Sequence, residues 1–509
     1  MSTMELLASG FSVVFQPQMF IMVILAVILG TIFGALPGVS ATMAVALGLT
    51  FTYTMDPIPA IVFLVAIYCS SITGGSITAI LFKIPGVPSS APTTFDGYPM
   101  AQRGEAGKAL GVALIASAIG GLFSALCMFL LSQPLTAAAL QFGPSDLFAV
   151  TFMGLSILTC LDGDNVLKTV ISGLLGLLLA CIGQDKMYAV QRMTFGSKQL
   201  LAGVEMIPVL IGLFAVTEVL KQTNKKDRLN AKDGVGGGKV NTKMPSFKEL
   251  WGIKWLMARC SVVGTVVGIL PGAGATIASF LCYTMENKVS KHPEKFGTGI
   301  IDGVAASEAA NNAATGGAMV PLLSLGIPGG NAAAVMMSAL VLKGVQLGPL
   351  LLVNQPTYLS ATFASMIITN IVMVVVAIGI AKVFAQILSI PYSFLGPIII
   401  MLAVIGSYAT QMSIADVQIM VIAGILGIVV KVCHFNSAAL VLGLVLGGMC
   451  ESNFSRAYTM MRGSLKDMFV RPIAGPIMIF CVVMLLWPVV MPMIKKHRAS
   501  KDGQTDAKA

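Results

Sequence analysis

Long apolar segments alternate with short polar breaks along the whole chain. The clearest apolar segments cover residues 18–36, 58–82, 109–132, 358–388 and 472–494. A helix needs about 20 apolar residues to cross a hydrocarbon core about 30 Å thick, and several further segments are shorter or interrupted by Gly and Pro. The pattern therefore predicts an all-α polytopic membrane protein. We expect about 10–12 transmembrane helices plus broken helices or re-entrant hairpins.

The composition excludes a water-soluble protein of this length. Of the 509 residues, 56% are hydrophobic and 11% are charged, whereas about 25% of residues are charged in an ordinary soluble domain. The chain also contains 53 Gly and 24 Pro. These residues are too frequent for plain spanning helices and suit broken ones.

Charge divides the chain but does not indicate nucleic-acid binding. The formal net charge is +10, and the basic residues cluster in residues 221–259 and in the tail, as the positive-inside rule expects. We therefore predict a first transmembrane repeat (1–220), a basic cytoplasmic linker (221–254), a second transmembrane repeat (255–494) and a polar C-terminal tail (495–509).

Three markers recur in the same order in the two halves. The first, Gly30 to Thr42, matches Gly264 to Thr276 at eight of thirteen positions, at an offset of 234 residues. Thr73-Gly74-Gly75 and Ile84-Pro85-Gly86 match Thr315-Gly316-Gly317 and Ile327-Pro328-Gly329 at offsets of 242 and 243, and residues 170–176 match 421–427. This order indicates an internal duplication. We expect the two repeats to have inverted topology.

The first marker contains a helix break in each half, at Leu36-Pro37-Gly38 and Leu270-Pro271-Gly272. Proline cannot donate to the helical ladder, and backbone freed at membrane depth must be buried in protein or line a watery cavity. Matching breaks in two repeats indicate a transporter's binding site. Carbonyl and hydroxyl oxygens there suit a coupling cation, so the predicted cation-binding residues are Gly38, Ser40, Thr42, Gly272, Gly274 and Thr276.

The second marker is a small polar cluster inside an apolar segment. If a helix begins just after each Gly-Gly pair, its free N–H groups and its positive dipole end would face a carboxylate. Close helix packing is the alternative reading of these small residues. The predicted substrate-binding residues are Ser71, Thr73, Gly74, Gly75, Asn311, Asn312, Thr315, Gly316 and Gly317.

Ionisable residues within apolar segments are costly and are therefore functional candidates. Glu308 shares a helical face with Asn311 and Asn312, so we interpret it as a possible coupling residue. Lysines near segment ends, such as Lys83 and Lys343, favour snorkelling to the interface instead.

Two other function classes are alternatives to a transporter. A passive anion channel needs a continuous polar lining, whereas the polar residues here form isolated clusters. An intramembrane aspartyl protease would use Asp162 or Asp164 with Asp416, but the segment around Asp162 lacks the GxGD form. We therefore expect no enzyme, no nucleic-acid partner and no cofactor, apart from Na⁺ as a possible coupling ion.

At these motifs the sequence resembles the large membrane subunit of the tripartite tricarboxylate transporters. The resemblance rests on GTIFGALPGVSATMA (30–44), the stretch from SSITGGS to GEAGKAL (70–110) and GVAASEAANNAATGGAMVPLLSLGIPG (303–329). The DGYPMA stretch that begins at Asp96 is especially characteristic, and Ser307 replaces a proline that this family would lead us to expect.

The resemblance implies a multi-pass secondary transporter of the bacterial inner membrane. Its partners would be membrane lipid, a small membrane subunit and a periplasmic substrate-binding protein that delivers the substrate. The substrate would be a carboxylate, such as citrate or a related di- or tricarboxylate. Uptake by alternating access, possibly of the elevator type, would be driven by a Na⁺ or H⁺ gradient.

Overall fold

The computed structural model describes residues 3–36, 39–161, 166–185, 190–223, 244–272, 274–387 and 392–486. Helices dominate this part of the chain, which confirms the all-α polytopic class. Six of its helices are long and apolar enough to cross a membrane, and shorter apolar helices of 10–17 residues accompany them. The six are Pro17–Ala35, Pro57–Phe82, Ala106–Ala139, Thr357–Ile380, Ile414–Val432 and Ser437–Met460.

The chain forms two compact units, and each takes residues from both halves of the sequence. Unit 1 comprises Met1–Leu140 and Glu205–Val429, and unit 2 comprises Gln141–Val204 and Val430–Ala509. The domain boundaries expected from the sequence stay predictions. Most of the basic linker and the C-terminal tail lie outside the described residues.

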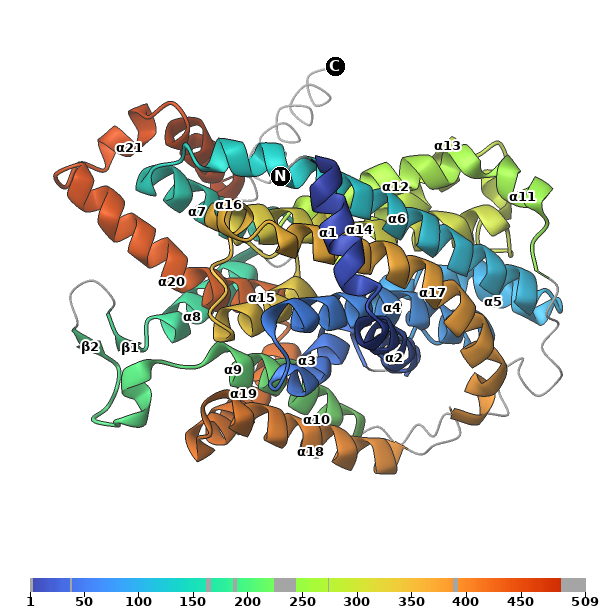
Figure 1. The fold of residues 1–509 in the computed structure, drawn as a ribbon, viewed down its shortest axis with the longest axis horizontal. Coiled ribbons are helices and arrows are strands. Elements are labelled where there is room, and N and C mark those ends of the chain that lie inside the picture. The colour runs from blue at the N-terminus through green and yellow to red at the C-terminus, as the bar shows by residue number, and fades with distance from the viewer. Residues whose placement is uncertain are drawn as a thin grey trace, which may run out of the picture. The chain divides into compact units, whose positions relative to one another are not determined.

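Unit 1 holds most of the helices (Figure 1). From its first stretch come α1 (Thr3–Val14), α2 (Pro17–Ala35), α3 (Ala41–Thr52), α4 (Pro57–Phe82), η1 (Pro88–Ser90), α5 (Thr93–Gln102) and α6 (Ala106–Ala139). From its second come α9 (Met206–Ile211), η3 (Gly212–Val216), α10 (Thr217–Thr223), α11 (Phe247–Gly252), α12 (Lys254–Ile269), α13 (Gly274–Val289), η6 (Pro293–Lys295), α14 (Ile301–Leu325), α15 (Asn331–Leu342), α16 (Pro349–Asn354), α17 (Thr357–Ile387), α18 (Tyr392–Gln411) and α19 (Ile414–Val432).

Unit 2 is built around the packing of α8 on α20. Its elements are α7 (Pro144–Leu161), α8 (Val166–Ala180), β1 (Gly183–Gln184), β2 (Gln191–Arg192), η2 (Gln199–Ala202), α20 (Ser437–Met460), α21 (Lys466–Val470) and a helix over Ala474–Leu486. Strands β1 and β2 pair as a short antiparallel hairpin. Arg192 of β2 forms salt bridges with Asp185 and with Glu451 of α20, which ties the hairpin to the helices.

Helices of unit 1 end where the sequence predicts breaks. α2 ends at Ala35 and α12 ends at Ile269, and the leucine after each is extended, with ψ of 117° at Leu36 and 122° at Leu270. A new helix then begins, at Ala41 after the first break and at Gly274 after the second. Pro37 and Gly38 lie outside the described residues.

The packing of α2 on α4 is repeated by the packing of α12 on α14. A Cβ at Gly34 would overlap the carbonyl of Ser71, and a Cβ at Gly268 would overlap that of Ala314. Equivalent residues are therefore 234 positions apart in α2 and α12, and 243 positions apart in α4 and α14.

The same 243-residue relation pairs Gly74 with Gly317, which corrects the offset of 242 read from the two Thr-Gly-Gly motifs. Gly74 faces the carbonyl of Thr31, and Gly317 faces that of Thr265. The two halves are therefore structural repeats. Within them, Thr73 is not equivalent to Thr315, because the 243-residue offset aligns Thr73 with the next residue, Gly316.

The equivalent helices α4 and α14 contact each other directly. Thr73 of α4 donates to Asn312 of α14, whereas Cys69, one turn earlier in α4, donates to Thr315, one turn later in α14. The helices are therefore antiparallel where they touch. In addition, α4 packs on α17 and α14 packs on α6. These contacts favour inverted topology, which stays a prediction.

Candidate functional site

Both Thr-Gly-Gly clusters lie inside continuous helices, not at helix starts. Gly74 and Gly75 are in α4, and Gly316 and Gly317 are in α14. The expectation that a helix begins just after each Gly-Gly pair is therefore wrong, because the intact ladder already engages these backbone N–H groups. The glycines instead allow neighbouring backbone to approach, as Gly74 does at Thr31.

Polar side chains from both repeats meet where α4 crosses α14. The Thr73 hydroxyl donates to Asn312 Oδ1 at 3.1 Å, and Asn312 Nδ2 donates to Asn311 Oδ1 at 2.8 Å. Asn311 Nδ2 reaches Glu308 Oε2 at 3.3 Å. All four side chains are fully buried. The structure thus joins four of the predicted residues in one hydrogen-bonded chain.

The other hydroxyls of these clusters serve their own helices. Ser71 donates to the carbonyl of Tyr68, and Thr315 donates to that of Asn312. Thr315 also accepts from the Cys69 thiol at 3.6 Å across the α4–α14 contact. In the described conformation the Ser71 hydroxyl is engaged within α4, and the Thr315 hydroxyl also takes part in the helix crossing.

The Ile-Pro-Gly loop of each repeat packs against the helix that precedes the break of the same repeat. In repeat 1, Gly86 lies against the carbonyl of Gly34 and donates to that of Gly75 at 3.3 Å. In repeat 2, Gly329 lies against Gly268, and the Gly272 N–H donates to the Gly329 carbonyl at 3.2 Å.

Two helices begin side by side at the second break. Gly274 opens α13 and Gly330 caps α15, and a Cβ at Gly330 would lie 3.8 Å from the Cα of Gly274. Gly272 and Gly274 both have positive φ, at 80° and 61°, which suits glycine. The N-terminal amides and the positive dipole ends of α13 and α15 therefore converge, which is an arrangement that favours an anion.

Asn331 is the first residue of α15 and was missed in the sequence. Its Oδ1 is buried, with no hydrogen-bond partner among the described residues. The signal was present, because a Gly-Gly-Asn sequence directly after Ile-Pro resembles a helix start.

The remaining predicted cation-binding residues lie at the starts of α3 and α13. Ser40 caps α3 by accepting from the Met43 N–H at 3.1 Å. Thr42 and Thr276 are half-buried in the first turns of α3 and α13. These residues follow the two breaks in the chain, whereas Gly38 lies outside the described residues, so cation binding stays a prediction.

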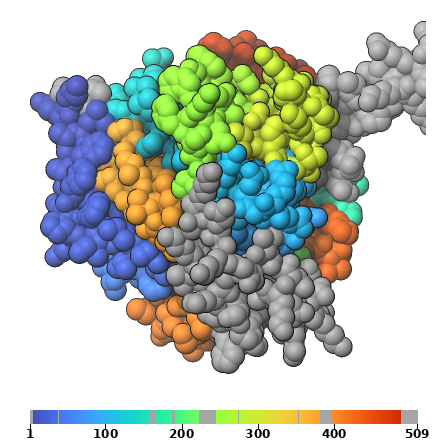
Figure 2. All heavy atoms as spheres, turned by 90° about the vertical axis from the view of Figure 1, so that its right-hand side faces the viewer, coloured from blue at the N-terminus to red at the C-terminus, as the bar shows by residue number. Residues whose placement is uncertain are grey.

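Asp96 explains the DGYPMA stretch. Its buried Oδ1 accepts from the N–H groups of Gly297, Gly299 and Ile300 at 2.8–3.0 Å, and its Oδ2 accepts from Tyr283 at 2.8 Å. Repeat 1 thereby holds the loop that leads into α14 of repeat 2. Figure 2 shows the surfaces of α5 and of α11 to α13 meeting on this side of unit 1.

The linker's C-terminal end is fixed on the same surface. Lys108 of α6 pairs with Glu249 of α11 at 2.5 Å, and Ser246 and Glu249 form a capping box. The Lys108 ammonium and the Ser246 amide and hydroxyl lower the pKa of Glu249 to about 2.

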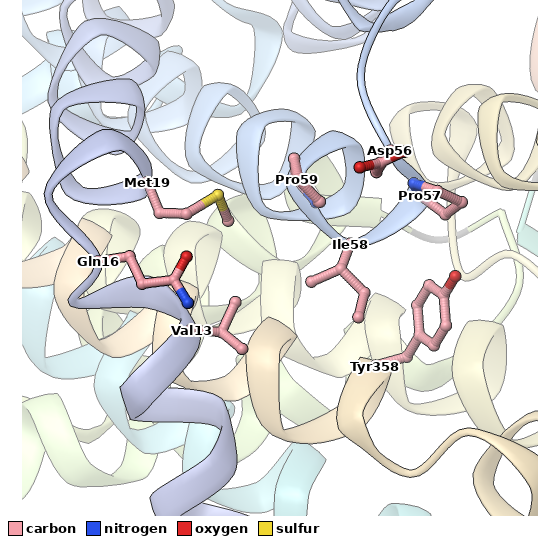
Figure 3. Close-up of a pocket in the computed structure, with 8 residues that line it drawn as sticks. All are labelled: Val13, Gln16, Met19, Asp56, Pro57, Ile58, Pro59 and Tyr358. Carbon is pink, nitrogen blue, oxygen red and sulfur yellow. The ribbon is translucent and has the colours of Figure 1, made fainter.

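A surface pocket of about 330 Å³ lies elsewhere in unit 1 (Figure 3). It contains none of the predicted site residues. Its lining comes from the end of α1 and the starts of α2, α4 and α17, through Val13, Gln16, Met19, Asp56, Pro57, Ile58, Pro59 and Tyr358.

Proteins of Agrobacterium vitis are similar in sequence to this chain. A relative from Agrobacterium vitis, an uncharacterized 52.8 kDa protein in the TAR-I ttuC' 3' region, is 36% identical over 95% of this chain and 96% of its own length. A second A. vitis protein, uncharacterized and from the TAR-II ttuC' 3' region, is 37% identical over 45% of this chain and 95% of its own length.

No solved structure matches the chain. The model of the tripartite tricarboxylate transporter TctA family matches residues 20–442, which include both helix breaks, both Ile-Pro-Gly loops and the helix crossing between them. Because this match covers most of its length, the chain belongs to the tripartite tricarboxylate transporter TctA family.

Proposed function

We propose that this protein imports a carboxylate, such as citrate or a related di- or tricarboxylate, across the bacterial inner membrane. The observation that carries the proposal is the convergence of the α13 and α15 N-termini at the second break. A substrate carboxylate accepts hydrogen bonds from the amides of these first turns, and the two helix dipoles stabilise its charge. Asn331 adds a side-chain amide at the same place.

The crossing of α4 and α14 supplies the second part of the site. Thr73, Asn311 and Asn312 offer hydroxyl and amide groups between the two repeats. A motion that separates the repeats would release these groups from one another for the remaining carboxylates. The site then opens alternately to either side of the membrane.

A cation gradient of Na⁺ or H⁺ drives uptake in this proposal. The hydroxyls of Ser40, Thr42 and Thr276 and the backbone carbonyls at the two breaks are candidate oxygen ligands for a cation. A periplasmic binding protein delivers the substrate, and a small membrane subunit completes the transporter, as the tripartite family implies.

Substitution at the second break tests the substrate site. Asn331→Asp places a negative charge at the converging N-termini, so we expect binding of radiolabelled citrate by the purified complex to weaken at least about tenfold, or about 1.4 kcal/mol. Asn354→Asp makes the same chemical change on exposed residue 354 of α16 and should leave binding unchanged. Equal affinity in both variants would show that the substrate carboxylate does not bind at this break.

The side chains at the helix crossing need a separate test. Thr73→Ala, Asn312→Ala and Thr315→Ala are assayed for uptake after each variant is shown to reach the membrane. Wild-type uptake by all three refutes their assignment to the substrate site. Accumulation against a concentration gradient in vesicles separates a transporter from a passive anion channel.

A further inference from the structure

Glu308 is a buried carboxylate without a cationic partner. It lies in the middle of α14 with 0% of its surface exposed, and no salt bridge of the described residues includes it. Glu286 provides the contrast within the same unit. It is 2% exposed, and Arg259 donates two hydrogen bonds to it, at 3.0 and 2.7 Å.

Neutral donors surround Glu308 on every side. Thr93 of α5 lies 2.5 Å from Oε1, whereas Ser117 of α6 and Asn311 of α14 reach Oε2 at 3.1 and 3.3 Å. The Thr93 hydroxyl is also 3.0 Å from Ser307 Oγ, and Ser307 can donate onward to the Gly303 carbonyl at 2.9 Å.

The charged groups on the neighbouring elements are engaged elsewhere. On α5, Asp96 binds the loop before α14, and Arg103 binds carbonyls of that loop. On α6, Lys108 pairs with Glu249, and on α12, Arg259 pairs with Glu286 of α13. The other titratable groups on the elements that pack against α14, with their caps, and on its first turn are Asp56, Tyr68, Cys69, Lys83, Tyr98, Glu105, Cys127, Lys254, Cys260, Cys282, Tyr283, Lys288, Asp302 and Lys343.

We propose that Glu308 is a proton-binding site and that its proton is the coupling ion. An ionised carboxylate without a counter-charge is strongly disfavoured in a buried site, so the charge must be neutralised. A proton on Oε1 fits the hydrogen bonds without rearrangement. Oε1–H donates to Thr93, Thr93 donates to Ser307, and Ser307 donates to the Gly303 carbonyl.

A sodium ion fits this site less well. The Thr93 and Glu308 oxygens lie 2.5 Å apart, in direct contact with each other. A metal ion would need these oxygens to separate and surround it. The geometry therefore assigns a proton to this carboxylate.

The coupling step rests on the proposed carboxylate transport. Glu308 connects through Asn311 and Asn312 to Thr73, so its protonation state changes the donors and acceptors offered at the helix crossing. One proton binds the Glu308 carboxylate from water on the outer side, forming the O–H bond, and the same bond breaks when the site opens inward. Each cycle thus carries one proton with the substrate.

Infrared spectroscopy of the purified complex tests the proton site without any transport. At neutral pH we expect a protonated-carboxyl C=O band in the wild type and in Glu286→Gln, and its loss in Glu308→Gln. Persistence of the band in Glu308→Gln, or its absence from the wild type, overturns the proposal. If Glu308→Gln does not fold, Glu308→Asp must shift the band, and an unchanged band overturns the proposal equally.

Uptake by reconstituted vesicles tests the coupling. In sodium-free buffer, an inward proton gradient should accelerate citrate uptake by the wild type at least tenfold, and Glu308→Gln should lose this acceleration. Uptake that follows only a sodium gradient overturns proton coupling and leaves carboxylate transport standing. The infrared band can behave as expected while no gradient drives carboxylate uptake. That combination would support the proton site at Glu308 and reject the proposed function.

Discussion

At the scale of single residues, close approach and hydrogen bonding explain positions that composition alone leaves open. Gly317 is a clear case. A Cβ there would overlap the carbonyl of Thr265, whereas a Cβ at Gly379 in α17 would meet nothing within 4 Å. The same substitution should therefore have opposite effects at the two positions.

Gly317→Ala should destabilise the protein by about 1–3 kcal/mol, because the added methyl group forces α12 and α14 apart. Gly379→Ala is the matched control and should be neutral or stabilising by up to about 1 kcal/mol, since it raises helix propensity at an exposed position. Thermal unfolding in detergent measures both. Equal midpoints for the two variants would show that the packing of α12 on α14 does not require glycine.

Protonation of Glu249 should control the attachment of the linker's end. Its pKa is lowered to about 2 by the Lys108 ammonium first and by Ser246 second, against about 4.3 for a free glutamate. A lowered pKa in the folded state means that the stabilisation is fully present above about pH 4.3 and is lost as the pH falls towards 2.

The fluorescence of Trp251 and Trp255 reports this attachment in a Trp487→Phe background. It should stay constant from pH 7 to about pH 4 and change only below that, whereas Glu249→Gln should show no such transition. A transition near pH 6 would contradict the pairing with Lys108.

At the scale of elements, the sequence predicts the helix breaks better than the site between them. Proline and glycine at Leu36 to Gly38 and at Leu270 to Gly272 predict helix ends for a local reason, and the helices end there. The Thr-Gly-Gly clusters could not be interpreted locally. Whether glycine ends a helix or lets another helix approach depends on the neighbouring element, which lies far away in sequence.

Long-range contacts are also why Asp96 and Asn331 received no predicted role. The partners of Asp96 lie about 200 residues further along the chain, at Gly297 to Ile300. Asn331 matters only because α13 begins beside it. No periodicity within one segment contains this information.

Removing the Asp96 charge should loosen the loop before α14. Asp96→Asn replaces an acceptor of four hydrogen bonds with a group that also carries two donors, and buried donors left without partners cost about 1–3 kcal/mol. We expect a lower unfolding midpoint and faster trypsin cleavage near Lys295. Asp467→Asn makes the same change on an exposed residue of α21 and is the control. Equal cleavage rates in the two variants would argue against the Asp96 contacts.

At the scale of the whole molecule, the antiparallel contact of α4 with α14 makes a topological prediction. Thr54 and Gly297 are equivalent positions in the two repeats, just before α4 and α14, by the 243-residue relation. In inverted repeats they face opposite sides of the membrane.

Cysteines introduced at Thr54 and Gly297, one at a time and with exposed Cys433 replaced by serine, can be labelled by a membrane-impermeant maleimide. We expect labelling of intact cells at position 54 only, and labelling at position 297 only after the membrane is opened. Labelling of both positions from the same side would show that the repeats are parallel.

The most direct test of the proposed function is a density map of the transporter complex with bound citrate. The account predicts density for the anion at the converging N-termini of α13 and α15, within hydrogen-bonding distance of Asn331. A map in which this junction is closed and the citrate lies away from both breaks would contradict it.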